Sequence, residues 1–407
     1  MEAVRDWAGA ARVGLERAAR ARDRDAGRGS GSYAFLFRGR DCERTYRFVV
    51  WPEWTSSAGP IFGCSISGLR FYFPMRAMIL TEQKPVEDSP LTLREVAPPQ
   101  AGAGEVRIRV SVCGVCRTDI HIAEGDLALH RSPIIPGHQI VGRIDQIGGG
   151  VTRLRVGQRI GVAWLRHVDG TCAFCARGRE NLCPDSRYTG YDVDGGYAEY
   201  ATIAEEFAYE LPENFSDEQV APLLCGGLIG YRALERAEVP ERGRLLLVGF
   251  GSSAHIVIQL ALARGHEVYV VTRSENHIRQ SRALGAVWAG ADFRALPAKV
   301  DAAILFAPSG KLVPPIMAAL TRGGICSIAG IHLSDVPTLN YEQHLFEERE
   351  LRSVTANTRA DAHALLAEAA AVRILPQTTA YPLEEANRAL CDMKASRVDG
   401  TPVLIIG

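Results

Sequence analysis

A glycine-containing turn between an apolar stretch and a helix constrains the fold of this 407-residue chain more than any other feature. Residues 244–248 form a short, largely apolar run, as expected for a parallel strand buried on both faces. Gly249, Gly251 and Ala254 follow in the spacing G-x-G-x-x-A, and residues 255–264 continue at helical period. The first glycine allows a tight turn, the second lets the backbone approach a pyrophosphate, and the alanine allows close helix packing. This strand, turn and helix predict a dinucleotide-binding domain.

The end of the next predicted strand, residues 267–271, bears on the choice of dinucleotide. NAD enzymes place an acidic residue there to bind the ribose 2′-hydroxyl, whereas NADP enzymes place a neutral or basic residue there. In this chain Thr272 and Arg273 follow the strand, and no carboxylate occurs before Glu275. We therefore expect a preference for NADP(H), with Arg273 pairing with the 2′-phosphate, while NAD stays open as the alternative.

Two cysteines and one histidine on separate segments form a candidate metal site. Cys116 lies in the stretch VCGVCRTDIH, His138 lies in PGHQ and Cys225 lies in LCGG. A catalytic zinc takes such a set when its fourth position stays open for water or substrate, whereas a structural zinc takes four protein ligands. We expect these three side chains to meet only in the folded domain. Cys113 is expected to be a buried apolar residue, although C-x-x-C in isolation could be a redox pair or a zinc knuckle.

Residues close to Cys116 in the sequence could orient a metal ligand and transfer a proton. Asp119 is placed to accept the second ring N–H of His138. Thr118 and His121 supply a hydroxyl and a titratable ring, which can carry a proton from an alcohol to solvent. Taken alone, each of these residues would more often be a turn, cap or partly exposed residue. Their spacing and co-occurrence favour the functional interpretation.

The chain contains four motifs: VCGVCRTDIH at 112–121, PGHQ at 136–139, GGYAEY at 195–200 and PLLCGG at 222–227. Together they resemble the zinc-dependent alcohol dehydrogenases of the medium-chain dehydrogenase/reductase superfamily, in particular its cinnamyl-alcohol-dehydrogenase-like bacterial branch. The similarity extends from about Met75 to the C-terminus. It implies an α/β protein with a GroES-like antiparallel β-barrel catalytic domain and a Rossmann domain. The chain departs from the family at Gln139, where a glutamate is usual, which removes a negative charge near the metal.

A second group of candidate metal ligands lies in a cysteine-rich lobe. Asp169, Cys172, Cys175 and Cys183 are separated by two, two and seven residues. In the resembled family this lobe holds a structural zinc with four thiolates, and here Asp169 takes the first position. A carboxylate can ligate zinc, so we expect a second zinc, and the alternative is a lobe held by packing alone. A nucleic-acid-binding zinc ribbon is disfavoured because no basic, aromatic face accompanies the cysteines.

The resemblance implies an alcohol dehydrogenase or aldehyde reductase acting on a primary aliphatic or aromatic alcohol with NAD(P). Zinc would polarise the substrate oxygen, hydride would pass between the substrate carbon and nicotinamide, and the proton would leave through Thr118, the cofactor ribose and His121. Arg117 and Arg359 would contact the pyrophosphate, although each could be a surface charge. Other implied neighbours of the reactants are Trp164 and Leu165 in the substrate pocket, and Ala307 and Gly330 near the nicotinamide.

Three alternatives stay open. A polyol or formaldehyde dehydrogenase would share the zinc site and differ only in its pocket. A zinc-free quinone or enoyl reductase of the same superfamily would keep the glycine turn but lack the three ligands. A non-catalytic protein on the same scaffold would need neither Thr118 nor His121.

The composition disfavours several classes of partner. The chain is 47% hydrophobic and 23% charged, and its net charge of -1 gives no long-range field for nucleic acid or an anionic membrane surface. No apolar run reaches the length that spans a bilayer, so we expect a soluble protein. Thiols that serve as metal ligands must stay reduced, which favours a cytoplasmic location. Because the resembled family forms dimers and tetramers, we expect a homodimer or a homotetramer.

The chain divides into four predicted segments. Residues 1–74 hold twelve arginines, no lysine and eight acidic residues. We expect a loosely ordered extension or a mis-assigned start there, with an Arg-rich helix at 4–22; a transit peptide is disfavoured because such peptides are poor in acidic residues. Alternating apolar residues between 77 and 110 predict half-buried strands of a small antiparallel barrel. The other segments are a catalytic domain at 75–225 with the zinc lobe at 165–185, a Rossmann domain at 226–353 and a return to the catalytic domain at 354–407.

Overall fold

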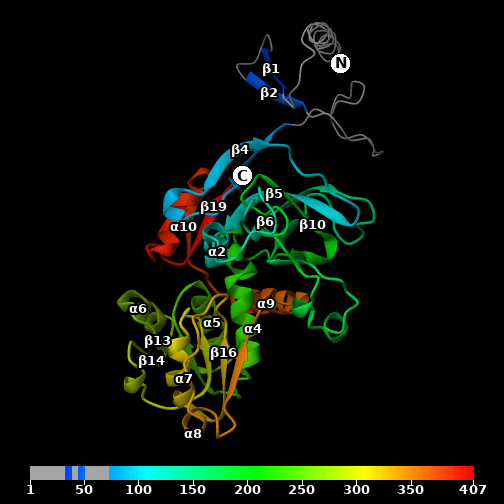
Figure 1. Ribbon diagram of the computed structural model, residues 1–407. Coiled ribbons are helices and arrows are strands. Elements are labelled where there is room, and N and C mark those ends of the chain that lie inside the picture. Colours follow the sequence, from blue (N-terminus) through cyan, green and yellow to red (C-terminus); the bar gives the residue numbers. More distant parts are fainter. Residues whose placement is uncertain (1–32, 39–44, 51–72) are drawn as a thin grey trace. The chain divides into compact units, whose positions relative to one another are not determined.

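The computed structural model describes residues 33–38, 45–50 and 73–407 (Figure 1). The chain forms two compact units, Met1–Pro74 and Met75–Gly407. Every helix in the described part of the chain is too short or too polar to cross a bilayer.

The described part of the first unit is a pair of strands. β1 (Tyr33–Arg38) and β2 (Thr45–Val50) pair in antiparallel register. These strands were not predicted, although both segments are rich in the aromatic and β-branched residues that favour strands. The helix expected at 4–22 lies outside the described residues.

The larger unit contains a mostly antiparallel sheet of seven strands. At its centre, β5 (Glu105–Gly114) alternates between buried and more exposed residues. That alternation is the pattern that predicted half-buried strands, and the GroES-like barrel is confirmed. β6 (Gln139–Ile147) pairs with β5, and so does β19 (Thr401–Ile405), so the end of the chain completes this sheet. The other strands are β7 (Arg159–Val162), β10 (Tyr200–Ala204), β11 (Ala208–Glu210) and β18 (Thr378–Pro382).

Shorter elements surround this sheet. Two antiparallel pairs, β3 with β4 and β8 with β9, lie outside it. Helices α2 and α10 pack against each other beside the barrel, as Figure 1 also shows. These elements are β3 (Met75–Leu80), β4 (Leu91–Val96), α2 (Arg117–Glu124), β8 (Leu165–His167), β9 (Arg187–Tyr188), α3 (Asp217–Val220) and α10 (Ala386–Lys394).

A second sheet of six parallel strands has the order β14-β13-β12-β15-β16-β17. The middle strand β12 has four consecutive buried residues, as predicted for a strand covered on both faces. Leu245 and Leu247 pack into one core with α4 (Gly226–Ala237) and α5 (Ser252–Ala263), while Leu246 and Val248 pack into a second core with α7 (Val313–Ala319). The predicted Rossmann fold is confirmed. The strands are β12 (Arg244–Val248), β13 (Glu267–Val271), β14 (Trp288–Gly290), β15 (Val300–Leu305), β16 (Leu320–Ile328) and β17 (Glu350–Ser353).

The strand order creates a binding crevice at the carboxyl ends of β12 and β15. From β12 the chain first builds outward through β13 and β14, and then returns to the other side of β12 with β15. Ligands of such sheets bind where the strand order reverses. The helices of this half are α4 (Gly226–Ala237), α5 (Ser252–Ala263), α6 (Glu275–Ala283), α7 (Val313–Ala319), α8 (Tyr341–His344) and α9 (Arg359–Val372).

Candidate active site

The structure brings together the three side chains that the sequence predicted as ligands of a catalytic zinc. The Cys116 Sγ lies 3.3 Å from the His138 Nε2 and 3.8 Å from the Cys225 Sγ. All three ligand atoms lie within 4.8 Å of one another. One ion can therefore contact all three residues.

Strand pairing explains why two distant ligands meet. Cys116 begins α2 two residues after β5, and His138 precedes β6. Gly114 of β5 is paired with Gln139 of β6, so both ligands leave the same end of the two strands. Gly137, with φ +92°, turns the chain there, and a Cβ at this position would lie 2.3 Å from the Tyr197 ring. Only glycine fits this turn.

Asp119 holds two of the ligands. Its Oδ2 accepts a 2.8 Å hydrogen bond from the Cys116 backbone N–H. Its Oδ1 lies 3.4 Å from the His138 Nδ1, and both atoms are buried without another partner in the described structure. The carboxylate therefore fixes the backbone of one ligand and faces the ring of the other, as expected around a metal-bound imidazole.

The chemistry of the set suits a divalent cation. Burial raises the pKa of the Cys116 thiol well above its ordinary value, and the neighbouring Cys225 raises it further. A thiolate here is unstable without a positive charge in contact with it. Zinc supplies that charge and accepts two thiolates and one imidazole, so the residues fit the expected ion.

Trp164 forms one wall beside this site. Its ring meets the edge of the His138 ring with centroids 4.9 Å apart. It also stacks on Tyr188 at 4.9 Å and on Tyr191 at 5.8 Å, which fixes its orientation. Leu165, which was expected to line the same pocket, is fully buried in the barrel core. Only the first of the two predicted pocket residues faces the cleft.

Thr118 and His121 lie one turn apart on α2 and both line a cleft of about 1270 Å³. Thr118 is buried in the first turn of this helix. The His121 Nδ1 lies 2.7 Å from the Asp126 Oδ2. That hydrogen bond lowers the pKa of the Asp126 carboxyl and leaves the other ring nitrogen of His121 free of this partner.

The same cleft extends over the glycine turn. Gly249 has φ +88°, and a Cβ there would lie 2.9 Å from the Ala307 backbone nitrogen. Gly251 faces open space, and Ala254 is buried in the first turn of α5. The N-terminus of α5 therefore opens onto the cleft, where its free N–H groups can bind a phosphate. Both Ala307 and Gly330 line the cleft as well.

Two arginines that line the cleft are free of protein partners. Arg273 and Arg117 are exposed, and neither guanidinium has a hydrogen bond or an ion pair among the described residues. Thr272, between β13 and Arg273, is mostly buried. In contrast, the nearby Arg294 is paired with Asp292 at 3.2 Å. Arg273 and Arg117 are thus available to an anionic ligand.

Arg359, predicted as a pyrophosphate ligand, forms ion pairs with two carboxylates of the protein. Its guanidinium pairs with Glu180 at 2.9 Å and with Glu206 at 2.5 Å, and it covers the Phe207 ring. It lies outside the lining of the cleft. The two carboxylates compensate its charge and join α9 to the lobe.

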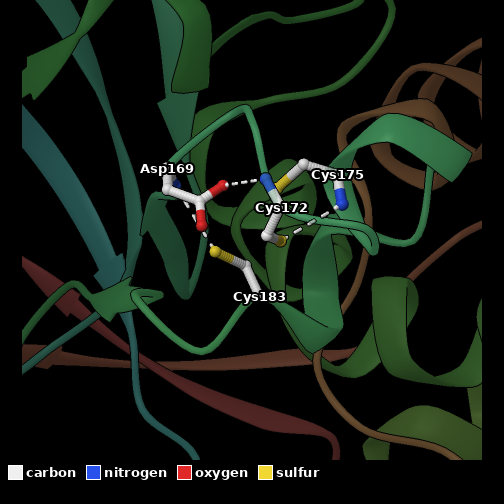
Figure 2. A group of neighbouring side chains, drawn as sticks. All are labelled: Asp169, Cys172, Cys175 and Cys183. Atoms are coloured by element: carbon white, nitrogen blue, oxygen red, sulfur yellow. Dashed lines mark hydrogen bonds between the residues drawn. The ribbon is translucent and has the colours of Figure 1, made fainter.

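The cysteine-rich lobe also brings its four predicted ligands together (Figure 2). The ligand atoms of Asp169, Cys172, Cys175 and Cys183 all lie within 4.8 Å of one another. The Asp169 Oδ1 accepts hydrogen bonds from the backbone of Thr171 and Cys172, which lower the pKa of this carboxyl. Asp169 is thus anionic and held in place, which suits a ligand.

Two residues that the sequence analysis did not assign also shape the cleft. Gln139, noted only as a departure from the family, is buried with its Nε2 unpartnered among the described residues. His332 lies in the segment after β16, and its ring is 5.5 Å from that of His121. A histidine two residues beyond Gly330 was a visible signal, but nothing in its spacing links it to α2.

Comparisons with known proteins agree with this geometry. Residues 102–213 match the family model described as the alcohol dehydrogenase GroES-like domain. The chain is 50% identical over 337 residues to a probable alcohol dehydrogenase, AdhA, of Mycobacterium tuberculosis, which covers 82% of this chain and 97% of that relative. It is 32% identical over 344 residues to an alcohol dehydrogenase of Geobacillus stearothermophilus, which covers 81% of this chain and 99% of that relative.

A solved structure supports the same comparison. The thermostable alcohol dehydrogenase of Pyrobaculum aerophilum, determined with cobalt and zinc bound, superimposes with a TM-score of 0.75. The two chains are 26% identical, and the match covers 82% of this chain and 99% of that one. The similarity includes both the barrel and the parallel sheet, because it spans nearly all of that protein.

Proposed function

This chain belongs to the alcohol dehydrogenases of the medium-chain dehydrogenase/reductase superfamily, and we propose that it is a zinc-dependent enzyme that transfers hydride between a primary aliphatic or aromatic alcohol and NADP(H). The convergence of Cys116, His138 and Cys225 at the cleft carries this proposal. These three residues would hold the zinc, which would supply a Lewis acid for the substrate oxygen. The unpartnered Arg273 supports the choice of NADP.

The three ligands and Asp119 prepare the site for the alcohol. Cys116, His138 and Cys225 would hold the zinc, and Asp119 keeps the first two in place through the contacts described above. Bound zinc supplies a Lewis acid, which makes an alcohol hydroxyl more acidic. Trp164 covers the His138 edge and gives the alcohol's carbon chain an apolar surface.

The cofactor side of the cleft binds a dinucleotide. Gly249 and Gly251 let the backbone approach a pyrophosphate, and the α5 N-terminus donates hydrogen bonds to it. Arg273 pairs with the 2′-phosphate, and Arg117 neutralises a further phosphate charge. The nicotinamide supplies the hydride acceptor when bound.

Thr118 and His121 handle the proton that leaves the alcohol. The Thr118 hydroxyl accepts it from the substrate side, and the His121 ring, which is less buried than Thr118, receives it next. Asp126 fixes His121 through the Nδ1, so the other ring nitrogen takes part in the transfer.

We further propose a second, structural zinc at Asp169, Cys172, Cys175 and Cys183, supported by their convergence (Figure 2). The protein would be a cytoplasmic homodimer or homotetramer. The cytoplasmic location is supported by eight free cysteines among the described residues, five of them in these two candidate sites, since thiolate ligands require a reducing compartment.

A substrate panel tests the function. Primary aliphatic and aromatic alcohols, polyols, formaldehyde with a thiol, and quinones are assayed with NADP and NAD, before and after chelation, with zinc content measured in the same samples. We expect oxidation of primary alcohols, loss of activity on chelation, recovery with zinc, and two zinc ions per chain. Quinone reduction by zinc-free protein would contradict the proposal.

A further inference from the structure

His332 lies beside the proton-handling residue of the barrel. His121 comes from α2, whereas His332 comes from the segment that follows β16 of the parallel sheet. Their ring centroids are 5.5 Å apart with 38° between the planes, and both rings line the cleft. Two titratable rings from different halves of the unit therefore face each other at the same opening.

The His332 ring is more exposed to solvent than the His121 ring. The side chain of His121 is only 17% exposed and has one nitrogen bound to Asp126. His332 is exposed to solvent. A proton on His121 has limited direct access to water, whereas a proton on His332 can pass to bulk solvent or to a buffer molecule.

Charged groups around the pair come from several elements. Asp126 faces His121 directly, and Arg117 lies one turn earlier on α2. Lys394 of α10 acts on Asp126, but it is itself paired with Glu124 at 2.7 Å and with Glu87 at 3.0 Å. Because Lys394 is already compensated, the carboxylate of Asp126 is the charge in direct contact with the His121 ring.

We propose that His332 is the outer member of a two-ring proton exit, so that a proton received by His121 passes to His332 and then to solvent. This rests on the proposed function. In alcohol oxidation the C–H hydrogen leaves as hydride to the nicotinamide cofactor, and the O–H proton leaves through Thr118, His121 and His332. The two transfers together balance the conversion of alcohol to carbonyl, and reduction uses the same path inward.

A single-turnover experiment compares His332→Gln with the wild type. The zinc-loaded full chain is mixed with benzyl alcohol and NADP in weak buffer, while nicotinamide absorbance and a pH indicator are followed together. We expect proton release to slow by about tenfold, less than the about 100-fold typical of a base in direct contact with substrate. Added imidazole should restore the rate, and the KM for benzyl alcohol, measured in steady-state assays of the same proteins, should stay unchanged. A matched control is His363→Gln, which alters an exposed histidine outside the cleft.

Two outcomes would overturn this role. The first is proton release in His332→Gln as fast as in the wild type. The second is a slow release that imidazole cannot restore, because a purely structural defect would not respond to a small base.

A measurement on the resting protein tests the proton exit independently of the proposed enzyme function. The exchange of the His121 ring N–H with water is measured by NMR in the resting protein, and His332→Gln should slow it by a similar factor. If the wild type oxidises no alcohol, the proposed function fails, and this exchange rate still decides whether His332 connects His121 to solvent. Unchanged exchange would refute the exit.

Discussion

At the scale of the residue, one carboxylate organises the candidate zinc site. Asp119 binds the Cys116 backbone through one oxygen and faces the His138 ring with the other. The sequence could predict this pairing because Asp119 is three residues from Cys116 and belongs to the same motif. It could not predict that burial would leave the facing atoms without any other partner, since that depends on packing by Tyr197 and its neighbours.

Replacing that carboxylate should weaken zinc binding. Asp119→Asn keeps the size of the side chain but loses the charge that orients His138, so we expect zinc affinity to fall by about 10- to 100-fold. Competition with a chromophoric chelator measures this affinity. Asp126→Asn provides the control, because Asp126 contacts no ligand residue and should leave zinc affinity as in the wild type. Equal affinities for Asp119→Asn and the wild type would exclude the orienting role.

Arg273 should decide the cofactor preference. In Arg273→Ala, kcat/KM for NADP should fall by about 10- to 100-fold, as expected for the loss of a charged hydrogen bond to a phosphate, while kcat/KM for NAD changes little. Arg294→Ala should affect neither value, because Arg294 is already paired with Asp292. A wild type that prefers NAD, with both values insensitive to Arg273→Ala, would disprove the NADP proposal.

At the scale of the element, local backbone structure could be predicted from the sequence, whereas contacts between distant segments could not. The turn at Gly249 was predictable because the required backbone geometry limits which residues fit. The position of Arg359 was not, because it is set by Glu180, 179 positions away. His332 was missed for the same reason, since its neighbour on α2 is brought near only by the packing of the two halves.

The link between α9 and the lobe gives a stability prediction. Burial raises the pKa of Glu180, but hydrogen bonds from Arg359 outweigh burial and lower it overall. Its stabilising contribution is therefore complete above the unfolded-state pKa of about 4.3 and is lost as pH falls through the lower folded-state value.

Glu180→Gln should accordingly reduce the free energy of unfolding by about 1 kcal/mol near neutral pH, after screening of this partly exposed pair. Urea unfolding of both proteins at several pH values measures the difference, which should shrink as the solution is acidified. A difference that grows on acidification would contradict the assigned sign. Glu342→Gln, an exposed carboxyl on α8, serves as the control.

At the scale of the whole molecule, the site belongs entirely to the unit Met75–Gly407. The sequence predicted the barrel from strands in which apolar and polar residues alternate. It predicted the Rossmann domain from an apolar strand, a glycine turn and a helix, because the hydrophobic period of this pattern differs from that of the barrel strands. It gave no steady period for the segment that contains β1 and β2, so those strands were missed.

A chain that starts at Met75 should therefore keep its activity. We expect kcat/KM for a primary alcohol within about twofold of the full chain, because all proposed ligands and cleft residues are retained. Steady-state assays of both chains, with circular dichroism to verify folding, provide the comparison. A folded but inactive shorter chain would show that residues 1–74 contribute to catalysis.

The zinc coordination by Cys116, His138 and Cys225 can be observed directly by X-ray absorption at the zinc edge. The measurement uses Cys175→Ser, in which the lobe site is impaired, with zinc limited to one ion per chain. We predict about two sulfur ligands at about 2.3 Å and the remainder nitrogen or oxygen at about 2.0 Å. A zinc without sulfur ligands, or one unchanged by a further Cys116→Ser substitution, would contradict the account.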